Sequence, residues 1–292
     1  MHMFGCMPTS HAFSARLWRL IQARSLDSSA LAEQAEVARA EIGSVLSGRD
    51  EPSSDLLRRL APALGLHRSD MFVIAGQPVP DDLAPHDPDA FGVIDSLAWS
   101  LTYLPHAVPQ LNELARAMPQ QPRLSGPRSP IRGNRQYPEG SGGLIVGLQQ
   151  NRNLAWLGAA QFLLGLGGGP MLSASTIGLI GGGRKALTPE LLAGFAAALD
   201  IPTMDIGALA DIDLTTVTVP THPDAAQAAD LIWESRRLTA GQIRLLRSAA
   251  DAIRREGAAD LPGTLAGPPY FNLWVQAPTR ANKSANGTTR DG

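Results

Sequence analysis

Cationic and hydroxyl side chains occur at matching places in two separate segments of the chain. In the first segment Arg39 and Ser44 lie within two helical turns of each other, and Arg49 follows a glycine. In the second segment Arg184 and Lys185 also follow a glycine. A guanidinium binds phosphate oxygens or the acceptor atoms of a base edge, and a hydroxyl reads either donor or acceptor. These residue types are able to contact a phosphate-bearing ligand without covalent chemistry.

The same residues also have a simpler interpretation that the sequence leaves open. An arginine placed after a helix C-terminus, such as Arg49 or Arg184, is favoured by the helix dipole without any ligand. Glu41 can accept a hydrogen bond from a cytosine amino group, and it can equally face solvent alone.

Residues for bond-breaking chemistry are not brought together by any sequence pattern. Cys6 is the single cysteine, and no two histidines have the i, i+4 spacing of a helical metal site. A G-x-S-x-G elbow is missing, and in Gly183-Arg184-Lys185 an arginine stands where a phosphate-binding loop needs its lysine. The sequence predicts no catalytic residue, no metal and no cofactor. The histidines are at positions 2, 11, 67, 86, 106 and 222.

An internal repeat must position these side chains. Residues 37–66 match residues 172–201 at an offset of 135, with nine identities that include Gly48/Gly183 and Arg49/Arg184. Upstream the offset falls to 128, so the second copy contains a seven-residue insertion around residues 165–170. This pattern indicates a duplicated unit of about 65 residues.

Both copies have the apolar spacing of short helices. In the first copy, groups of leucine, isoleucine and alanine recur at helical spacing with breaks between the groups, which predicts four or five helices and no strand. Asp27, Ser53, Ser173 and Thr188 are typical of helix starts, whereas glycines mark the stops. The predicted fold class is all-α, with two small bundles joined by a helical segment and a Pro/Gly-rich linker.

The segments between and after the copies have different compositions. Within the connector 77–118, residues 89–118 are predicted to form two helices broken near Pro105 and Pro109. Residues 119–142 are predicted to be a flexible linker without apolar period, and residues 223–256, within the segment 213–257, are predicted to contain one or two amphipathic helices. The predicted division of the chain is the first bundle (10–76), a helical connector (77–118), the linker (119–142), the second bundle (143–212), a C-terminal helical segment (213–257) and a disordered tail (258–292).

Composition restricts the setting of the protein. The 292 residues carry a net charge of −2, and only two of the 25 cations are lysine. No segment approaches the roughly 18 to 20 apolar residues that cross a bilayer. The first residues also lack the positively charged stretch followed by an apolar stretch that is typical of a secretion signal. We therefore expect a cytoplasmic protein that does not enter a membrane.

Residues 26–49 (LDSSALAEQAEVARAEIGSVLSGR), followed by Pro52 and a Leu-Leu-x-x-Leu-Ala-x-Ala-Leu-Gly run, carry a family resemblance. They resemble the Cro/CI-type (XRE) helix-turn-helix domain, and residues 144–209 look like a divergent second copy. The pair is similar to tandem helix-turn-helix transcriptional regulators of actinobacteria. The resemblance implies two lambda-repressor-like bundles and binding of double-stranded DNA.

The resemblance also assigns roles to individual residues. The helix from Ala38 to Leu46 would enter the major groove, while a residue before it and one after it would contact phosphates. The implied DNA-binding residues are Ser28, Arg39, Ala40, Glu41, Ser44 and Arg49 in the first copy, and Ser175, Thr176, Arg184 and Lys185 in the second.

Some positions depart from the family pattern and keep a second function open. Glu36 stands at the turn position that is usually glycine, and Ala38 replaces the usual hydroxyl cap. The alternative is a protein-interaction module, such as an antitoxin-like partner binder, that retains the fold without reading DNA. Under the first hypothesis the chain acts as its own pseudo-dimer, with the linker setting the reachable half-site spacings. A homodimer and a small-molecule effector also remain open.

Overall fold

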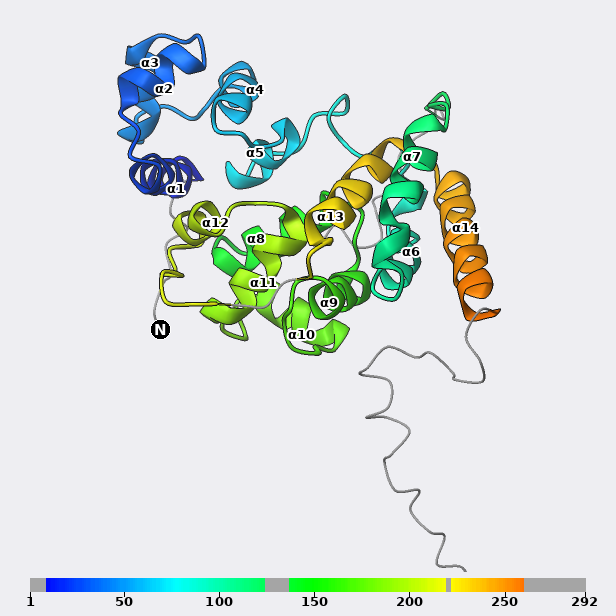
Figure 1. Ribbon diagram of the computed structural model, residues 1–292. Coiled ribbons are helices and arrows are strands. Elements are labelled where there is room, and N and C mark those ends of the chain that lie inside the picture. The colour runs from blue at the N-terminus through cyan, green and yellow to red at the C-terminus, as the bar shows by residue number, and fades with distance from the viewer. Residues whose placement is uncertain (1–8, 124–136, 219–221, 260–292) are drawn as a thin grey trace, which may run out of the picture.

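The computed structural model describes residues 9–123, 137–218 and 222–259, and every regular element in these ranges is a helix (Figure 1). The all-α prediction is thus confirmed for the described part of the chain, which contains fourteen α-helices and no strand. None of these helices is both long and apolar enough to span a membrane. Residues 141–142 of the predicted linker and residues 258–259 of the predicted disordered tail are helical, whereas residues 124–136 of the linker and the rest of the tail lie outside the described residues.

The first copy consists of five helices, and its predicted helix starts are confirmed. The carboxylate of Asp27 accepts hydrogen bonds from the N–H groups of Ser29 and Ala30, and Ser53 caps the fourth helix. Ala38 precedes the third helix without a side-chain cap. The helices are α1 (Thr9–Ala23), α2 (Ser28–Gln34), α3 (Arg39–Leu46), α4 (Ser54–Ala63) and α5 (Arg68–Ile74).

The second copy repeats these five helices at the offsets read from the sequence. Moving the starts of α3, α4 and α5 by 135 residues gives the starts of α10, α11 and α12, and moving α2 by 128 gives the start of α9. The insertion lies between α9 and α10. The helices are α8 (Ser141–Gln150), α9 (Trp156–Gly165), α10 (Ala174–Gly181), α11 (Pro189–Leu199) and α12 (Thr203–Ala210).

Backbone conformation follows the same repeat. Residues with positive φ end helices in both copies at equivalent positions, although the residue types differ. Gly65 has φ +55° and its counterpart Asp200 has φ +53°. The structure therefore supports the duplication independently of side-chain identity. The equivalent pairs are Ser25/Asn153, Gly48/Gly183, Gly65/Asp200 and Gly76/Asp211.

Four further α-helices form a covering layer beside the second copy (Figure 1). The predicted break near Pro105 separates the first two, whereas Pro109 lies inside the first turn of the second, where proline fits a helix. The helices are α6 (Ile94–Leu101), α7 (Val108–Ala117), α13 (Ala225–Glu234) and α14 (Ala240–Ala259). Short 3-10 helices cover Pro88–Ala90, Pro105–Ala107 and Ser235–Arg237.

Two hydrophobic cores hold the described helices together. The larger core runs without interruption through both copies, and includes Leu17, Leu57 and Phe195. The second core joins the covering layer to the second copy, because Phe162 and Leu166 belong to one cluster with buried residues of α6, α13 and α14. The two copies are therefore packed on each other directly.

Candidate functional site

Helix α3 presents one polar face to solvent and one apolar face to the core. Ile42 and Val45 are buried, and the Ser14 hydroxyl donates a hydrogen bond to the Val45 carbonyl, which ties α3 to α1. Arg39 and Ala40 are exposed, as is Glu41. The four-residue turn 35–38 joins α3 to α2 and contains Glu36 at φ +54°. An exposed short helix after a tight turn is the arrangement the sequence predicts.

Two of the predicted contact residues have local partners. The Ser44 hydroxyl donates a hydrogen bond to the Asp50 carboxylate, and the Arg49 Nε donates to the Ser47 hydroxyl at 2.9 Å. Ser44 is half-buried and Arg49 is exposed. Contact of Ser44 with a ligand therefore has to displace Asp50, whereas the remaining guanidinium donors of Arg49 face solvent.

Arg39 lies close to the start of α2. The pKa of the Asp27 carboxyl is lowered, first by hydrogen bonds from the N–H groups of Ala30 and Ser29 and to a smaller degree by the charge of Arg39. Ser28, which follows Asp27, is exposed. The structure thus places Ser28, Arg39 and Asp27 in one region.

Helix α10 differs from α3 in its cap and in its surroundings. Ser173 caps α10 by accepting a hydrogen bond from the N–H of Thr176, and its hydroxyl also bonds to that of Ser175 at 2.8 Å. After the helix, the N–H groups of Arg184 and Lys185 both donate to the Leu179 carbonyl, and the two side chains are exposed. Two cations therefore sit side by side just past the end of α10.

The charges around the two helices are opposite in sign. Residues 27–51, around α2 and α3, carry six exposed acidic side chains and only two exposed arginines. The equivalent residues 155–186, around α9 and α10, carry no acidic residue, and their two cations are Arg184 and Lys185. A polyanion is electrostatically better accommodated beside α10 than beside α3.

A buried polar cluster between the copies was missed by the sequence reasoning. Arg152, at the end of α8, forms an ion pair with Asp70 of α5 at 2.9 Å, and each side chain is 1% exposed. The Asn151 amide donates to the same carboxylate at 2.7 Å. Trp233 of α13 covers the cluster, with the guanidinium of Arg236 4.1 Å from its ring centre. A buried charge pair is uncommon enough that its place in the fold requires explanation.

A second buried carboxylate performs a capping role across elements. Asp95 of α6 accepts a hydrogen bond from the Ala155 N–H at 2.9 Å, at the start of α9. Asp27 does this for the equivalent helix α2, but the second copy has alanine at that position. Burial raises the pKa of Asp95 to about 6, against the opposing effect of the backbone N–H groups of Ala155 and Gly158.

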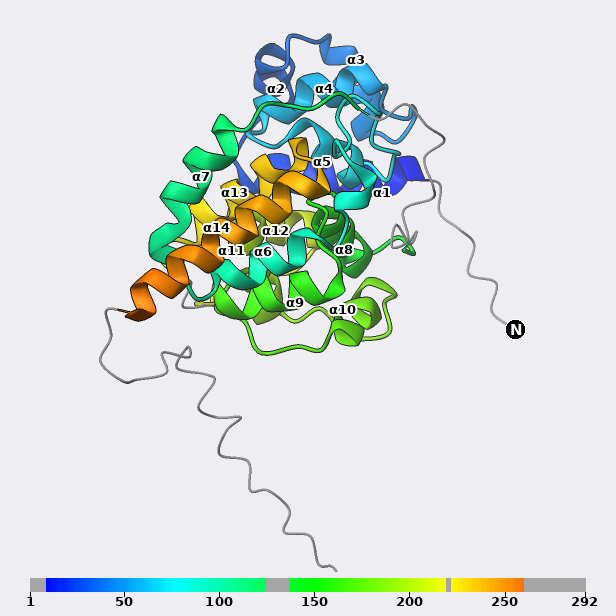
Figure 2. The same cartoon turned by 90° about the vertical axis from the view of Figure 1, so that its right-hand side faces the viewer.

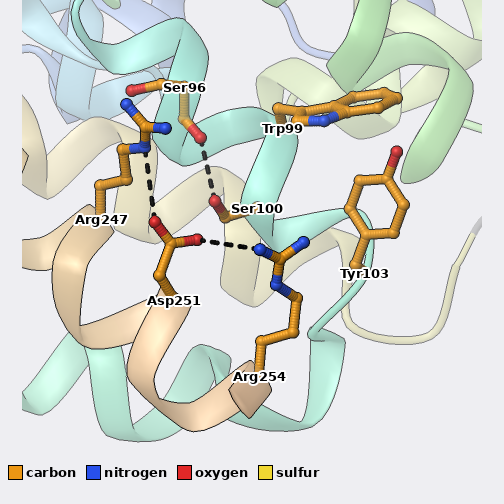
Figure 3. A pocket seen from close by; sticks show the side chains of 7 residues that line it. All are labelled: Ser96, Trp99, Ser100, Tyr103, Arg247, Asp251 and Arg254. Carbon is orange, nitrogen blue, oxygen red and sulfur yellow. Dashed lines mark hydrogen bonds and ion pairs between the residues drawn. The ribbon is translucent and has the colours of Figure 1, made fainter. Parts of the chain in front are cut away.

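One small cavity lies between α6 and α14 (Figure 3). Its volume is about 210 Å³, which is below the range of most sites for drug-sized ligands. Trp99 and Tyr103 meet edge to face at one side, while Asp251 lies between Arg247 and Arg254 at 3.7 and 3.8 Å. The cavity has no paired nucleophile and base. Among the described residues no group of histidine, cysteine or acidic side chains could hold a metal ion.

No protein-family model, curated protein or solved structure matches this chain.

Proposed function

We propose that this protein binds double-stranded DNA at specific sequences and acts as a transcriptional regulator. The observation that carries the proposal is the exposed polar face of α3, whose opposite face is anchored in the core by buried Ile42 and Val45. The major groove is about 12 Å wide and admits one helix. Because α3 is short and follows a tight turn, it can enter such a groove without a clash from a longer element.

The exposed side chains of α3 divide into base and backbone contacts. Arg39 can donate two hydrogen bonds to guanine, and Glu41 can accept one from cytosine. Ala40 leaves room for the groove floor, and Ser44 supplies a hydroxyl once Asp50 is displaced. We propose that Ser28, at the start of α2, and Arg49, after the end of α3, contact phosphates. Such contacts fix the protein on the duplex.

The second copy contributes charge more than readout. Arg184 and Lys185 are exposed in a region without acidic residues, so each phosphate contact there releases counterions without repulsion from a neighbouring carboxylate. Ser175 is exposed on the first turn of α10, and Thr176 is half-buried beside it. Their small side chains offer weak base discrimination.

The acidic surface around α3 favours a second candidate function. Six exposed acidic residues against two arginines would repel a duplex and would suit a basic protein partner. In that case the chain is a protein-interaction module that keeps the fold. The two functions differ in salt dependence, because a DNA binder with several phosphate contacts loses affinity steeply between roughly 50 and 200 mM salt.

Selection from a random pool of duplex DNA tests the proposal. The purified chain is incubated with the pool at low salt, and bound molecules are sequenced after several rounds. We expect an enriched motif. Arg39→Ala should relax preference at one or two base pairs by about 1 to 3 kcal/mol, whereas Arg49→Ala should weaken all sequences alike.

A matched control separates these effects from a general loss of positive charge. Arg255 is exposed on α14, far from α3 along the chain, so Arg255→Ala should leave the motif and the affinity unchanged. If the folded chain enriches no sequence at low salt, DNA binding is contradicted and the interaction module becomes the better explanation.

A further inference from the structure

The internal repeat assigns equivalent positions to four charged residues. Arg24 corresponds to Arg152 at the offset of 128, and Asp70 corresponds to Asp205 at the offset of 135. In the structure each arginine pairs with the aspartate of the other copy. Arg152 contacts Asp70 at 2.9 Å, and the Arg24 Nε donates to Asp205 Oδ1 at 2.9 Å. Exchanging the two copies therefore converts one ion pair into the other.

The helices around these pairs obey the same exchange. Helix α1 packs on α12, and its equivalent α8 packs on α5, which is the equivalent of α12. The Arg19 side chain of α1 donates to the Ala208 carbonyl at 2.7 Å. The equivalent residues are Gly147 and Val73, and Val73 Cγ1 would lie 3.0 Å from a Cβ added at Gly147. Backbone and side-chain contacts thus come in exchanged pairs across the interface.

Reciprocal contacts of this kind define a two-fold interface, in which residue i meets j and j meets i. We infer that the two copies form a built-in pseudo-twofold dimer, so that one chain is equivalent to a symmetric pair of one-copy subunits. The face through which a single copy would bind its twin is filled inside the chain. The interface therefore has a positioning role, because the pseudo-twofold rotation that relates the two copies also relates α3 to α10.

The DNA site follows from this geometry, and this step rests on the proposed function. Two reading helices related by a two-fold axis contact two half-sites in inverted orientation. Figures 1 and 2 show α3 and α10 at opposite ends of the two packed copies, and in Figure 2 both lie on the side away from α7. The two half-sites therefore lie in inverted orientation at one fixed spacing, and their sequences differ because α3 and α10 carry different exposed side chains.

The pseudo-twofold interface also changes the role expected for the linker. The sequence suggests that residues 119–142 set the reachable half-site spacings. The copies instead share one continuous core and two ion pairs, which fix the spacing without help from the linker. Arg123, one of the arginines in that segment, donates to the carbonyls of Asp81 and Ala84, so it is already engaged with the chain.

A distance measurement without DNA tests the interface directly. Ala40 and Ser175 are equivalent, exposed residues on α3 and α10. Spin labels at Ala40→Cys and Ser175→Cys, in a Cys6→Ser background, report the separation of the two helices in the full chain. We expect one narrow distance distribution, unchanged when about ten glycine and serine residues are inserted within residues 124–136. A distribution that shifts or broadens on insertion would show that the linker sets the spacing.

Charge exchange then tests the reciprocal pairs, at the pair that is less buried. Asp205→Arg places two cations together and should broaden the distance distribution, and adding Arg24→Asp should restore its width. Arg116 pairs with Asp230 between α7 and α13, so Arg116→Ala is the control and should leave the distribution unchanged. A distribution that stays narrow with Asp205→Arg alone contradicts the positioning role of the pair.

The selected DNA sequences separate this inference from the proposed function. Two half-sites in inverted orientation, with the same spacing in the parent chain and in the extended-linker chain, support both. A narrow, insertion-independent distance without any enriched DNA keeps the interface and removes DNA binding. Two half-sites in the same orientation, or at several spacings, contradict the inverted geometry.

Discussion

The two ion pairs between the copies have the same chemistry and occupy equivalent positions, but they differ in what covers them. Both side chains of the Arg152–Asp70 pair are 1% exposed. In the Arg24–Asp205 pair the arginine is 25% exposed and the aspartate 4%. The first pair is therefore removed from water, and the second retains contact with it.

Helix α13 causes this difference. Its Trp233 lies over the Arg152 guanidinium at 5.0 Å and stacks on His67 at 3.5 Å between ring centres. Arg236, which follows α13, donates to the backbone and side-chain oxygens of Asn151. Among the described residues, no aromatic side chain covers the Arg24–Asp205 pair in this way. One two-fold interface therefore has a dry half and a wet half.

The two pairs have the same chemistry, so their different exposure to water decides how much each contributes to the free energy of unfolding. In water an ion pair gains little, because each charge is well solvated when alone. Away from water the attraction is stronger, but a charge left without its partner is costly. We therefore expect the covered half to tolerate loss of one partner much less than the exposed half.

The largest effect is expected from Arg152→Met. The substitution leaves the Asp70 carboxylate buried without its counter-charge, and also removes hydrogen bonds to the carbonyls of Leu148 and Leu199. The free energy of unfolding should fall by about 3 to 5 kcal/mol, measured by urea denaturation. Combining it with Asp70→Asn should recover part of the loss, because no buried charge remains. A double variant as unstable as the single one would show that the cost is packing.

A smaller effect is expected from Arg24→Met in the exposed half. The arginine is 25% exposed, so its removal lets water reach the Asp205 carboxylate, and the loss should be about 1.5 to 3 kcal/mol, the range for a hydrogen bond to a charged group. The wild-type contribution should also weaken in high salt, because this pair is in contact with solvent. Equal losses from Arg24→Met and Arg152→Met would contradict the contrast between the two halves.

Much of the fold could be predicted from the sequence because its signals are local. Capping residues, helical apolar spacing and glycine stops act within a few residues, and they predicted the helix starts at Ser53, Ser173 and Thr188. The duplication was also visible, since nine identities fall in one short alignment. The predicted DNA-contact residues do fall on or beside exposed surfaces of α3 and α10, with Ser44 and Thr176 only half-exposed.

The interface could not be predicted, because its signals are long-range. Arg24 and Arg152 matched in the repeat, but Asp70 and Asp205 lie just beyond the aligned residues 37–66 and 172–201. An arginine is also expected at the surface, since charged side chains are seldom buried. The cap that Asp95 supplies to α9 comes from a helix about 60 residues earlier, and no local pattern indicates it.

The smallest expected effect is a difference between the two halves in how the free energy of unfolding depends on pH. Burial is the main cause that lowers the pKa of His67 to about 4, and nearby Arg152 and Arg236 add to it, although Asp70 opposes them. His67 belongs to the covered half, and its equivalent in the exposed half is Pro202, which does not titrate. The unfolded chain binds this proton near pH 6.5, so the contribution is complete above that pH and is lost as pH falls toward 4.

Comparison with His67→Phe isolates this contribution, because phenylalanine can keep the stacking on Trp233 without titrating. The wild-type chain should lose stability relative to the variant between pH 6.5 and 4, by less than about 1 kcal/mol, since part of the residue faces solvent that screens its charge. Asp95, with its pKa raised to about 6, gives a slope of opposite sign in the same range, but it is present in both chains and cancels in the difference. Thermal unfolding at several pH values measures that difference. A difference independent of pH would mean that His67 is protonated equally in the folded and unfolded chain.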